Sequence, residues 1–378
     1  MKHIVFLEQY AALGGGQQVL LELVRAALTE GCRVSVLIPA GPCSAKLENM
    51  GVEVVPVPPC RLSQGKKTLT DIVRFIVYGW SVFIRHAGML RHADLIYVNG
   101  NRLLLAALLS QIFFSRKAAY HIHLNHGGLE RRLFLLTLRL KSTRALVLPS
   151  EFIRRELLAA DIRFADPRVQ VVSNGLDARF SNIPFEDRFT DRPLQHIGIV
   201  GRVSPEKGQD VLVPLAKHFP QLQFHVLGDA AFSSVAYYEK LKREAPENVH
   251  FHGWVDDLPA KVREIGLQVC LVPSRCPPES PDRSFEAAPL VPLQMTALSC
   301  LVIVRRLGAL EDVAEKLSFW TFSEDRELVV LLESICMQKT GFLSDSVRRS
   351  HKYCLQAFSN NNFQYRLVDV LNSIQNKR

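Results

Sequence analysis

A glycine and two cations stand together in the segment 200–208, directly after an expected strand and before an expected helix at Gln209. Gly201 lets the backbone approach a ligand closely. Arg202 offers a planar fork of donors that suits a diphosphate, and Lys207 adds a mobile point charge. A helix beginning after this loop would add free N–H groups and the positive end of its dipole. The segment predicts a phosphate site, the alternative being a surface loop with two solvated cations.

Glycines and histidines mark two further places near the ends of expected strands. The glycine run 14–16 follows the first strand and permits a tight turn with exposed amides, or a flexible connection. His121 and His123 end a later strand, where alternation places both on one face, and His126 follows them. Three close histidines raise the question of a metal site, but no cysteine or acidic residue stands nearby at zinc spacing, so we expect no metal.

Strand-like and helix-like segments alternate through the chain in two series. In the first series we expect strands over 3–7, 33–38, 53–57, 94–98, 118–123, 145–148 and 169–172, and helices over 17–28, 102–114 and 151–159. In the second series we expect strands over 196–200, 223–227, 249–251, 269–272 and 301–304. The alternation predicts an α/β protein built from two Rossmann-like, doubly wound parallel sheets that face a central cleft.

An irregular segment, 178–193, separates the two series and is interpreted as a linker. We therefore expect an N-terminal domain over 1–180 and a C-terminal domain over 181–352. A polar helical pattern covers 350–376. We expect it to form a C-terminal helix over 353–378 that packs back on the N-terminal domain. Ligands of such folds bind at the carboxyl ends of the strands.

Five segments resemble, in the correct order, motifs of the retaining glycosyltransferases of family 4 (group 1), which have the two-lobed GT-B fold. The segment 201–208 resembles their G-R-x-x-x-x-K-G element, and 249–255 their V-x-F-x-G-x-V segment, which contacts the nucleotide base. Segments 171–177, 227–229 and 293–303 resemble the motifs P-N-G-V-D, V-G-D-G and L-E-A-M-A-x-G-x-P-V-I. The similarity covers essentially the whole chain.

The resemblance implies a role for individual residues. Arg202 and Lys207 would stabilise the leaving diphosphate, Glu286 would hold the donor sugar, and His123 would lie beside the transferred sugar, with His126 as a substitute. These four, His123, Arg202, Lys207 and Glu286, are the expected catalytic residues. The expected donor-binding residues are Gly15, Gly16, Asn174, Gly201, Gly228, Gly253, Trp254, Gln294 and Gly308.

The sequence departs from the family pattern around Glu286. Family members carry a second glutamate eight residues later, which usually binds the ribose, and here that position is Gln294. An amide still accepts a hydrogen bond from a hydroxyl but loses the strength that charge adds. Glu279, in a reshaped loop over 277–284, competes with Glu286 for the role of first acid, and Glu286 has the alternative of being a helix-terminal carboxylate. The family's later glycine pair is also altered, to Gly308 and Ala309.

Composition and charge limit the partners. Apolar residues make up 48% of the chain and the net charge is +9, which suits anionic partners. Eight cysteines without a C-x-x-C pair indicate reduced thiols in a cytoplasmic protein. Basic residues flank apolar segments over 61–91 and 131–141, a pattern typical of helices that lie on anionic membranes, although the apolar residues could equally be core. No nucleic-acid recognition motif is visible.

The function expected from the resemblance is transfer of a sugar, with retention at its C1, from a nucleotide-diphosphate sugar to an acceptor. The acceptor would be a glycan or a polyprenyl- or other lipid-linked glycan, in the biosynthesis of bacterial surface polysaccharide or lipopolysaccharide at the cytoplasmic face of the inner membrane. Neither a cofactor nor a metal is expected. Two alternatives stay open: a non-catalytic GT-B protein that binds nucleotide sugars or glycans, and a GT-B nucleotide-sugar epimerase.

Overall fold

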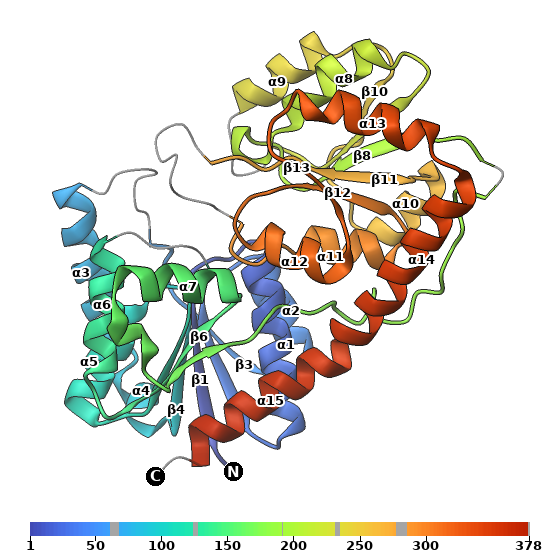
Figure 1. Ribbon diagram of the computed structural model, residues 1–378. Helices are drawn as coiled ribbons and strands as arrows, with labels where there is room; N and C mark the ends of the chain where they lie inside the picture. The colour runs from blue at the N-terminus through green and yellow to red at the C-terminus, as the bar shows by residue number, and fades with distance from the viewer. Residues whose placement is uncertain (61–67, 124–127, 191, 231–234, 277–285, 377–378) are drawn as a thin grey trace. The chain divides into compact units, whose positions relative to one another are not determined.

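The computed structural model describes residues 1–60, 68–123, 128–190, 192–230, 235–276 and 286–376. Its backbone contacts divide the chain into two compact units, one of Met1–Asn174 with Asn361–Arg378 and one of Gly175–Asn360. Each unit holds one parallel sheet with helices on both of its faces (Figure 1). The expected α/β class, with two Rossmann-like sheets, is therefore confirmed.

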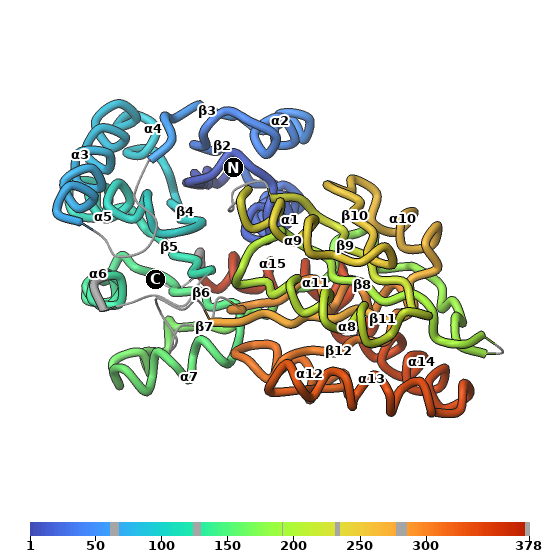
Figure 2. Tube along the Cα trace, turned by 90° about the horizontal axis from the view of Figure 1, so that it is seen from above, coloured from blue at the N-terminus to red at the C-terminus, as the bar shows by residue number. Residues whose placement is uncertain are grey.

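Seven parallel strands form the sheet of the first unit, in the order β3-β2-β1-β4-β5-β6-β7 (Figure 2). They are β1 (His3–Glu8), β2 (Arg33–Ile38), β3 (Glu53–Pro56), β4 (Leu95–Asn99), β5 (Ala118–His121), β6 (Thr143–Leu148) and β7 (Val169–Val171). The strand order reverses between β1 and β4. Ligands of doubly wound sheets bind beyond the carboxyl ends of the strands at such a reversal.

Helices cover this sheet from both sides (Figure 1). One side carries α1 (Gly15–Thr29) and α15 (Asn360–Asn376), and the other carries α3 (Leu69–Arg85), α4 (Ala87–His92) and α5 (Leu104–Phe114). The remaining helices of the unit are α2 (Pro42–Asn49), α6 (Gly128–Leu138), α7 (Glu151–Ala160) and the short 3₁₀ helix η1 (Ile162–Ala165). The apolar face of α1 packs on the inner residues of β1 and β2, which fixes the glycine turn at its start.

The end of the chain belongs to two helices rather than to one. The expected helical pattern over 350–376 is divided between α14 (Thr340–Ala357), in the second unit, and α15, in the first. Between them, the buried Phe358 accepts a hydrogen bond from the backbone N–H of Leu176 (2.8 Å). Phe363, Leu367 and Leu371 of α15 are buried in the same cluster as Ile4 and Phe6 of β1. The carbonyl of Phe358 is thus bonded to a residue distant in sequence at the point where α14 ends.

Six parallel strands form the second sheet, in the order β10-β9-β8-β11-β12-β13. They are β8 (His196–Val200), β9 (Gln223–Leu227), β10 (Val249–Phe251), β11 (Val269–Val272), β12 (Leu301–Arg305) and β13 (Trp320–Phe322). Its further helices are α8 (Leu212–His218), α9 (Val235–Glu244), α10 (Leu258–Ile265), α11 (Leu290–Ala297), α12 (Ala309–Leu317) and α13 (Glu327–Met337). The order reverses between β8 and β11, so the loop after β8 starts at this switch point.

The segment 178–193, interpreted from sequence as a linker, is packed into the second unit. Its Phe189 is buried among the core residues of the unit. The guanidinium of Arg188, also buried, donates to the carbonyl oxygens of Leu267 (3.0 Å) and Leu298 (2.7 Å). The irregular composition thus predicts the lack of helices and strands, but residues of this segment still pack into the core of the second unit.

Candidate functional site

Glycines bring the loops after β8 and β9 into backbone contact. Gly201 has a φ of 131°, and a Cβ on Gly228 would lie 1.9 Å from the carbonyl oxygen of Gly201, so no side chain fits there. The N–H of Val203 donates to the carbonyl of Asp229 (2.9 Å). Gly228 also forms an isolated antiparallel bridge with Gly253. Gly201, Gly228 and Gly253, all expected to bind the donor, therefore lie together at the carboxyl edge of this sheet.

A buried glutamine fixes the loop that carries the two cations. The side chain of Gln209 accepts from the backbone N–H of Ser204 (3.2 Å) and donates to the carbonyl of Arg202 (2.8 Å). Gly208, with a φ of 70°, packs so closely that a Cβ there would lie 2.5 Å from the carbonyl oxygen of Pro273. The helix expected at Gln209 begins as a 3₁₀ turn and becomes α-helical only at Leu212. The loop backbone is thus held while its cations project from it.

Lys207 and Glu286 form an ion pair between residues that lie 79 positions apart in the chain. Glu286 is buried, and its Oε1 accepts both from Lys207 Nζ and from the hydroxyl of Ser274 (2.6 Å). Arg202 is more exposed and pairs with Glu206 (2.5 Å). Ser274 was missed from sequence, although its place just after β11 is a signal that could have found it.

The charge of Lys207 decides the protonation of Glu286. Burial by itself would raise the pKa of this carboxyl. The charge of Lys207, the hydrogen bonds from Lys207 and Ser274, and the charge of Arg202 together outweigh burial and hold the pKa of Glu286 below its ordinary value. The edge of β8 and β11 therefore presents two cations and one ionised carboxylate on a rigid loop framework.

Four further residues expected to bind the donor lie in different parts of the chain. Gly308, with a φ of 59°, precedes α12, and the N–H of the next residue, Ala309, donates to the carbonyl of Glu286 (3.0 Å). Gln294 is buried on α11, and its side chain forms no hydrogen bond with the residues that the structure describes. Trp254 is exposed and donates to Asp256 (2.8 Å), while Asn174 ends the first stretch of the other unit.

In the first unit, His123 lies two residues beyond the end of β5. Its Nε2 is 2.6 Å from Oδ1 of Asn99, and its ring stacks on that of His121 with centroids 4.4 Å apart. A Cβ on Gly16 would meet the ring of His123 at 3.4 Å, whereas Gly15 is exposed at the start of α1. Burial holds the pKa of His121 well below its ordinary value, so that ring is neutral.

Sequence reasoning did not identify Glu8 and Asn99, which lie beside His123. Asn99 donates through Nδ2 to Oε2 of Glu8 (2.5 Å) and to the carbonyl of Gly16 (3.1 Å). Burial raises the pKa of Glu8 to about 7, against hydrogen bonds that lower it. Both residues end buried strands at the switch point, and a polar residue in that position is the signal that could have found them.

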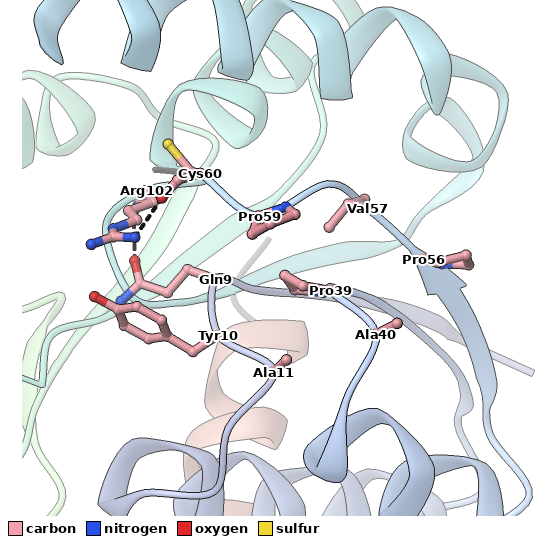
Figure 3. Close-up of a pocket in the computed structure, with 10 residues that line it drawn as sticks. All are labelled: Gln9, Tyr10, Ala11, Pro39, Ala40, Pro56, Val57, Pro59, Cys60 and Arg102. Carbon is pink, nitrogen blue, oxygen red and sulfur yellow. Dashed lines mark hydrogen bonds between the residues drawn. The ribbon is translucent and has the colours of Figure 1, made fainter. Parts of the chain in front are cut away.

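A hollow of about 520 Å³ opens beside this cluster, at the carboxyl ends of β1, β2 and β3 (Figure 3). Arg102 lies at one side of it, 4.7 Å from the ring centroid of Tyr10, and donates to the carbonyl of Cys60 (2.5 Å). The lining residues are Gln9, Tyr10, Ala11, Pro39, Ala40, Pro56, Val57, Pro59, Cys60 and Arg102. Its lining is mostly apolar and includes one aromatic ring and one cation.

Two alternatives from the sequence fall on residues that the structure leaves undescribed. Glu279, the competing first acid, and His126, the substitute for His123, both lie outside the described residues. Within the described ranges, no group of three or more His, Cys, Asp or Glu side chains is placed to hold a metal ion.

Two family models match the sequence, one for each series of strands. Residues 13–180 match the model described as Glycosyltransferase Family 4, and residues 186–346 match the model described as Glycosyl transferases group 1. The chain belongs to glycosyltransferase family 4. The expected family is therefore confirmed, and the chain is a glycosyltransferase. No curated protein sequence matches it.

Solved structures share the fold of this family 4 enzyme over its whole length. HepE of Anabaena, crystallised with UDP and glucose, superposes with a TM-score of 0.77 at 19% identity, covering 98% of this chain and 99% of that one. A glycosyltransferase of Rickettsia africae gives 0.75 at 14% identity, covering 100% and 99%. MurG of Acinetobacter baumannii gives 0.60 at 13%, covering 98% and 100%. These likenesses establish the GT-B fold.

Proposed function

We propose that this glycosyltransferase moves a sugar, with retention at C1, from a nucleoside-diphosphate sugar to a hydroxyl of a glycan or lipid-linked glycan. The observation that carries the proposal is the triad of Lys207, Glu286 and Ser274 at the switch point of the second sheet. A nucleotide-diphosphate sugar needs cations for its phosphates and acceptors for its hydroxyls, and this edge offers both. HepE, of the same fold, was crystallised with UDP-glucose, which supports this class of donor.

The chemistry follows from where charge develops. As the bond from C1 to the diphosphate breaks, negative charge grows on the leaving phosphate, and Arg202 and Lys207 stabilise it electrostatically. The ammonium of Lys207 has three donors, so it can keep Glu286 while it binds a phosphate oxygen. The acceptor hydroxyl attacks from the face that the diphosphate leaves and gives its proton to that phosphate. Glu286 holds sugar hydroxyls, and His123 binds the transferred sugar. The step needs no metal and no cofactor.

A thermal-shift screen against UDP, GDP, ADP and their sugar conjugates tests the donor site. A ligand that binds only the folded state raises the melting temperature. We expect one nucleotide to stabilise the wild type and not Lys207→Ala, while Lys217→Ala, the same change at an exposed lysine of α8, keeps the shift. Turnover with that donor, followed by NMR of the anomeric proton, then reports retention or inversion. If a nucleotide stabilised the protein but no acceptor gave turnover, the non-catalytic alternative would be favoured. The amide at Gln294 in place of the family's second glutamate is the feature that agrees with this alternative.

We further propose that the first unit lies on an anionic membrane surface through α3. This helix has a second apolar stripe, turned away from the core, in addition to the buried face formed by Tyr78 and Phe83. The exposed stripe follows helical spacing and consists of Leu69, Ile72, Val73, Ile76, Val77, Trp80 and Ile84. The ring of Trp80 lies 6.0 Å from that of exposed Phe113, which extends the stripe onto α5.

The exposed charged residues of α3 are all basic. Arg74 and Arg85 of α3 are exposed, and its one acidic residue, Asp71, is buried and bonded to Thr68 at the N-terminus of the helix. An apolar stripe flanked by cations binds anionic lipid by burial and by charge together. The other basic stretch behaves differently, because Phe134, Leu135 and Leu138 of α6 are buried. None of the helices in the described ranges has the length and hydropathy that a membrane span requires.

Sedimentation with vesicles tests this proposal. We expect the wild type to pellet with phosphatidylglycerol-containing vesicles and not with phosphatidylcholine alone. Val77→Asp should abolish binding, whereas Val330→Asp, a matched change at an exposed valine of α13, should not. Equal binding by both variants, or a dimer that Val77→Asp dissociates, would overturn the membrane proposal. We place the reaction at the cytoplasmic face of that membrane, in the assembly of bacterial surface polysaccharide or lipopolysaccharide.

A further inference from the structure

Polar side chains end three neighbouring strands of the first unit in a single row. Glu8 of β1 is paired in register with Asn99 of β4, and Asn99 with His121 of β5. Glu8 and Asn99 are 0% and 1% exposed. The transfer chemistry proposed for Lys207 and Glu286 makes no use of them. A carboxyl is costly to bury unless its hydrogen bonds are satisfied, so its partners indicate what it is for.

The carboxylate of Glu8 collects hydrogen bonds from three segments. Its Oε1 accepts from the backbone N–H groups of Gln9 (2.7 Å) and Tyr10 (2.9 Å) and from Nε2 of Gln17 on α1 (3.1 Å). Its Oε2 accepts from Nδ2 of Asn99 (2.5 Å). All are donors, which matches the acceptor-only character of an ionised carboxylate. Glu8 thus joins one wall of the hollow, the first turn of α1 and the residue that contacts His123.

These bonds fix the amide of Asn99 and, through it, the tautomer of His123. The Nδ2 of Asn99 donates both to Glu8 and to the carbonyl of Gly16 (3.1 Å), so the amide cannot be reversed without placing its oxygen against two acceptors. Its Oδ1 therefore faces Nε2 of His123 at 2.6 Å. An oxygen acceptor there requires that Nε2 carry the hydrogen of the neutral ring.

We propose that Glu8 is a positioning residue of the transfer reaction, which holds His123 in its Nε2-protonated form through Asn99 and holds the Gln9–Tyr10 wall of the hollow through their backbone. The inference rests on the proposed function, since that function assigns His123 to the transferred sugar. A carboxylate that orients a histidine and fixes its tautomer is a recurrent device in enzymes that act through a histidine.

The network responds to pH near neutrality because of Glu8. Burial raises the pKa of Glu8 to about 7. Among the described residues, the titratable group that interacts with it is the Cys43 thiol of α2, whose pKa burial raises to about 12. The neutral His121 and His123 lie on the other side of Asn99. Protonated Glu8 would turn a hydrogen toward groups that are themselves donors. The network is therefore complete above about pH 7 and loosened below it.

The test compares Glu8→Gln with Glu22→Gln in the full chain. Glu22 is also buried, but it lies on α1 away from His123 and bonds to Gln364 and Arg25. We expect Glu8→Gln to lower kcat on the order of tenfold to a hundredfold, as the loss of orienting partners does elsewhere. It should also remove the limb near pH 7 from the pH profile of kcat. Nucleotide-induced thermal shifts should be unchanged, and Glu22→Gln should behave as wild type.

NMR of ¹⁵N-histidine-labelled protein gives a readout independent of turnover, with His123→Ala to assign the signal. We expect His123 to be an Nε2–H tautomer in the wild type and to lose that preference in Glu8→Gln and in Asn99→Ala. The inference is overturned if both variants keep the wild-type tautomer, or if Glu8→Gln has the kcat and pH profile of Glu22→Gln. A wild type without turnover, but with the expected tautomer changes, would contradict the proposed function alone.

Discussion

Each of the two sheets places a buried glutamate at the carboxyl edge of its switch point, and the two glutamates differ in their partners. Glu286 is paired with Lys207, and its pKa lies below the ordinary value. Within the part of the chain that the structure describes, the donors to Glu8 are all neutral, and its pKa rises to about 7. The carboxyl edge of a sheet therefore holds a fixed charge in one unit and a carboxyl that titrates near neutrality in the other, although Glu8 ends β1 and Glu286 lies in the segment before α11.

The difference shows how one architecture serves two tasks. The second unit stabilises charge, which requires a cation whose attraction exceeds the cost of burial. The first unit orients groups, which requires directional hydrogen bonds rather than a paired cation. The Gly201 and Gly208 loop is packed backbone against backbone. The Glu8 network instead combines two backbone N–H groups with the side-chain amides of Gln17 and Asn99.

The largest effect is expected from removing the cation, which would make Glu286 resemble Glu8. Lys207→Ala should lower kcat on the order of 10² to 10³, as the loss of one preorganised donor does at other sites where charge develops. It should also raise the pKa of Glu286, because burial then acts with less opposition. Steady-state kinetics and a pH titration of turnover measure both. If Lys207→Ala had the same kcat as Lys217→Ala, the role given to the cation beside Glu286, and with it the contrast between the two glutamates, would be wrong.

Much of the fold could be predicted from sequence because parallel strands in α/β units are short, continuous apolar runs. The segments 3–7, 33–38 and 196–200 are such runs, and the strands begin and end within about a residue of them. The tail could not be predicted in the same way. Phe358 and Phe363 look alike in a helical pattern, and only their packing in different units separates α14 from α15.

Only part of the candidate site could be predicted from the sequence. Motifs pointed to Lys207 and Glu286, but their contact joins residues 79 positions apart and has no local signature. Glu8 ends an apolar run, where a charged residue is most simply interpreted as the end of a strand. Its four donors come from three segments, so its importance arises from the tertiary structure.

A smaller effect is expected in the pH dependence of stability. The unfolded chain releases the proton of Glu8 near the ordinary pKa of 4.5, and the folded chain releases it near 7. Between these values the folded state binds more protons, so the free energy of unfolding falls as pH rises, by at most about 3 kcal/mol. Urea unfolding at pH 5 and pH 8 should show this loss in the wild type and in Glu22→Gln, but not in Glu8→Gln. An equal loss in all three would assign it to other groups.

The smallest effect concerns Gln294, the position where the second unit carries an amide in place of the family's second carboxylate. Gln294→Glu should tighten binding of the nucleotide by about fivefold, because a charge-assisted hydrogen bond to a ribose hydroxyl is about 1 kcal/mol stronger than a neutral one. Burying the charge of the new carboxylate is costly, so it should lower the melting temperature of the unliganded protein. Calorimetric titration and thermal unfolding measure the two effects. If Gln294→Leu also bound the nucleotide more tightly, the ribose would not bind at this position, because leucine offers no acceptor. The charged residues of the donor site would then be Lys207, Arg202 and Glu286.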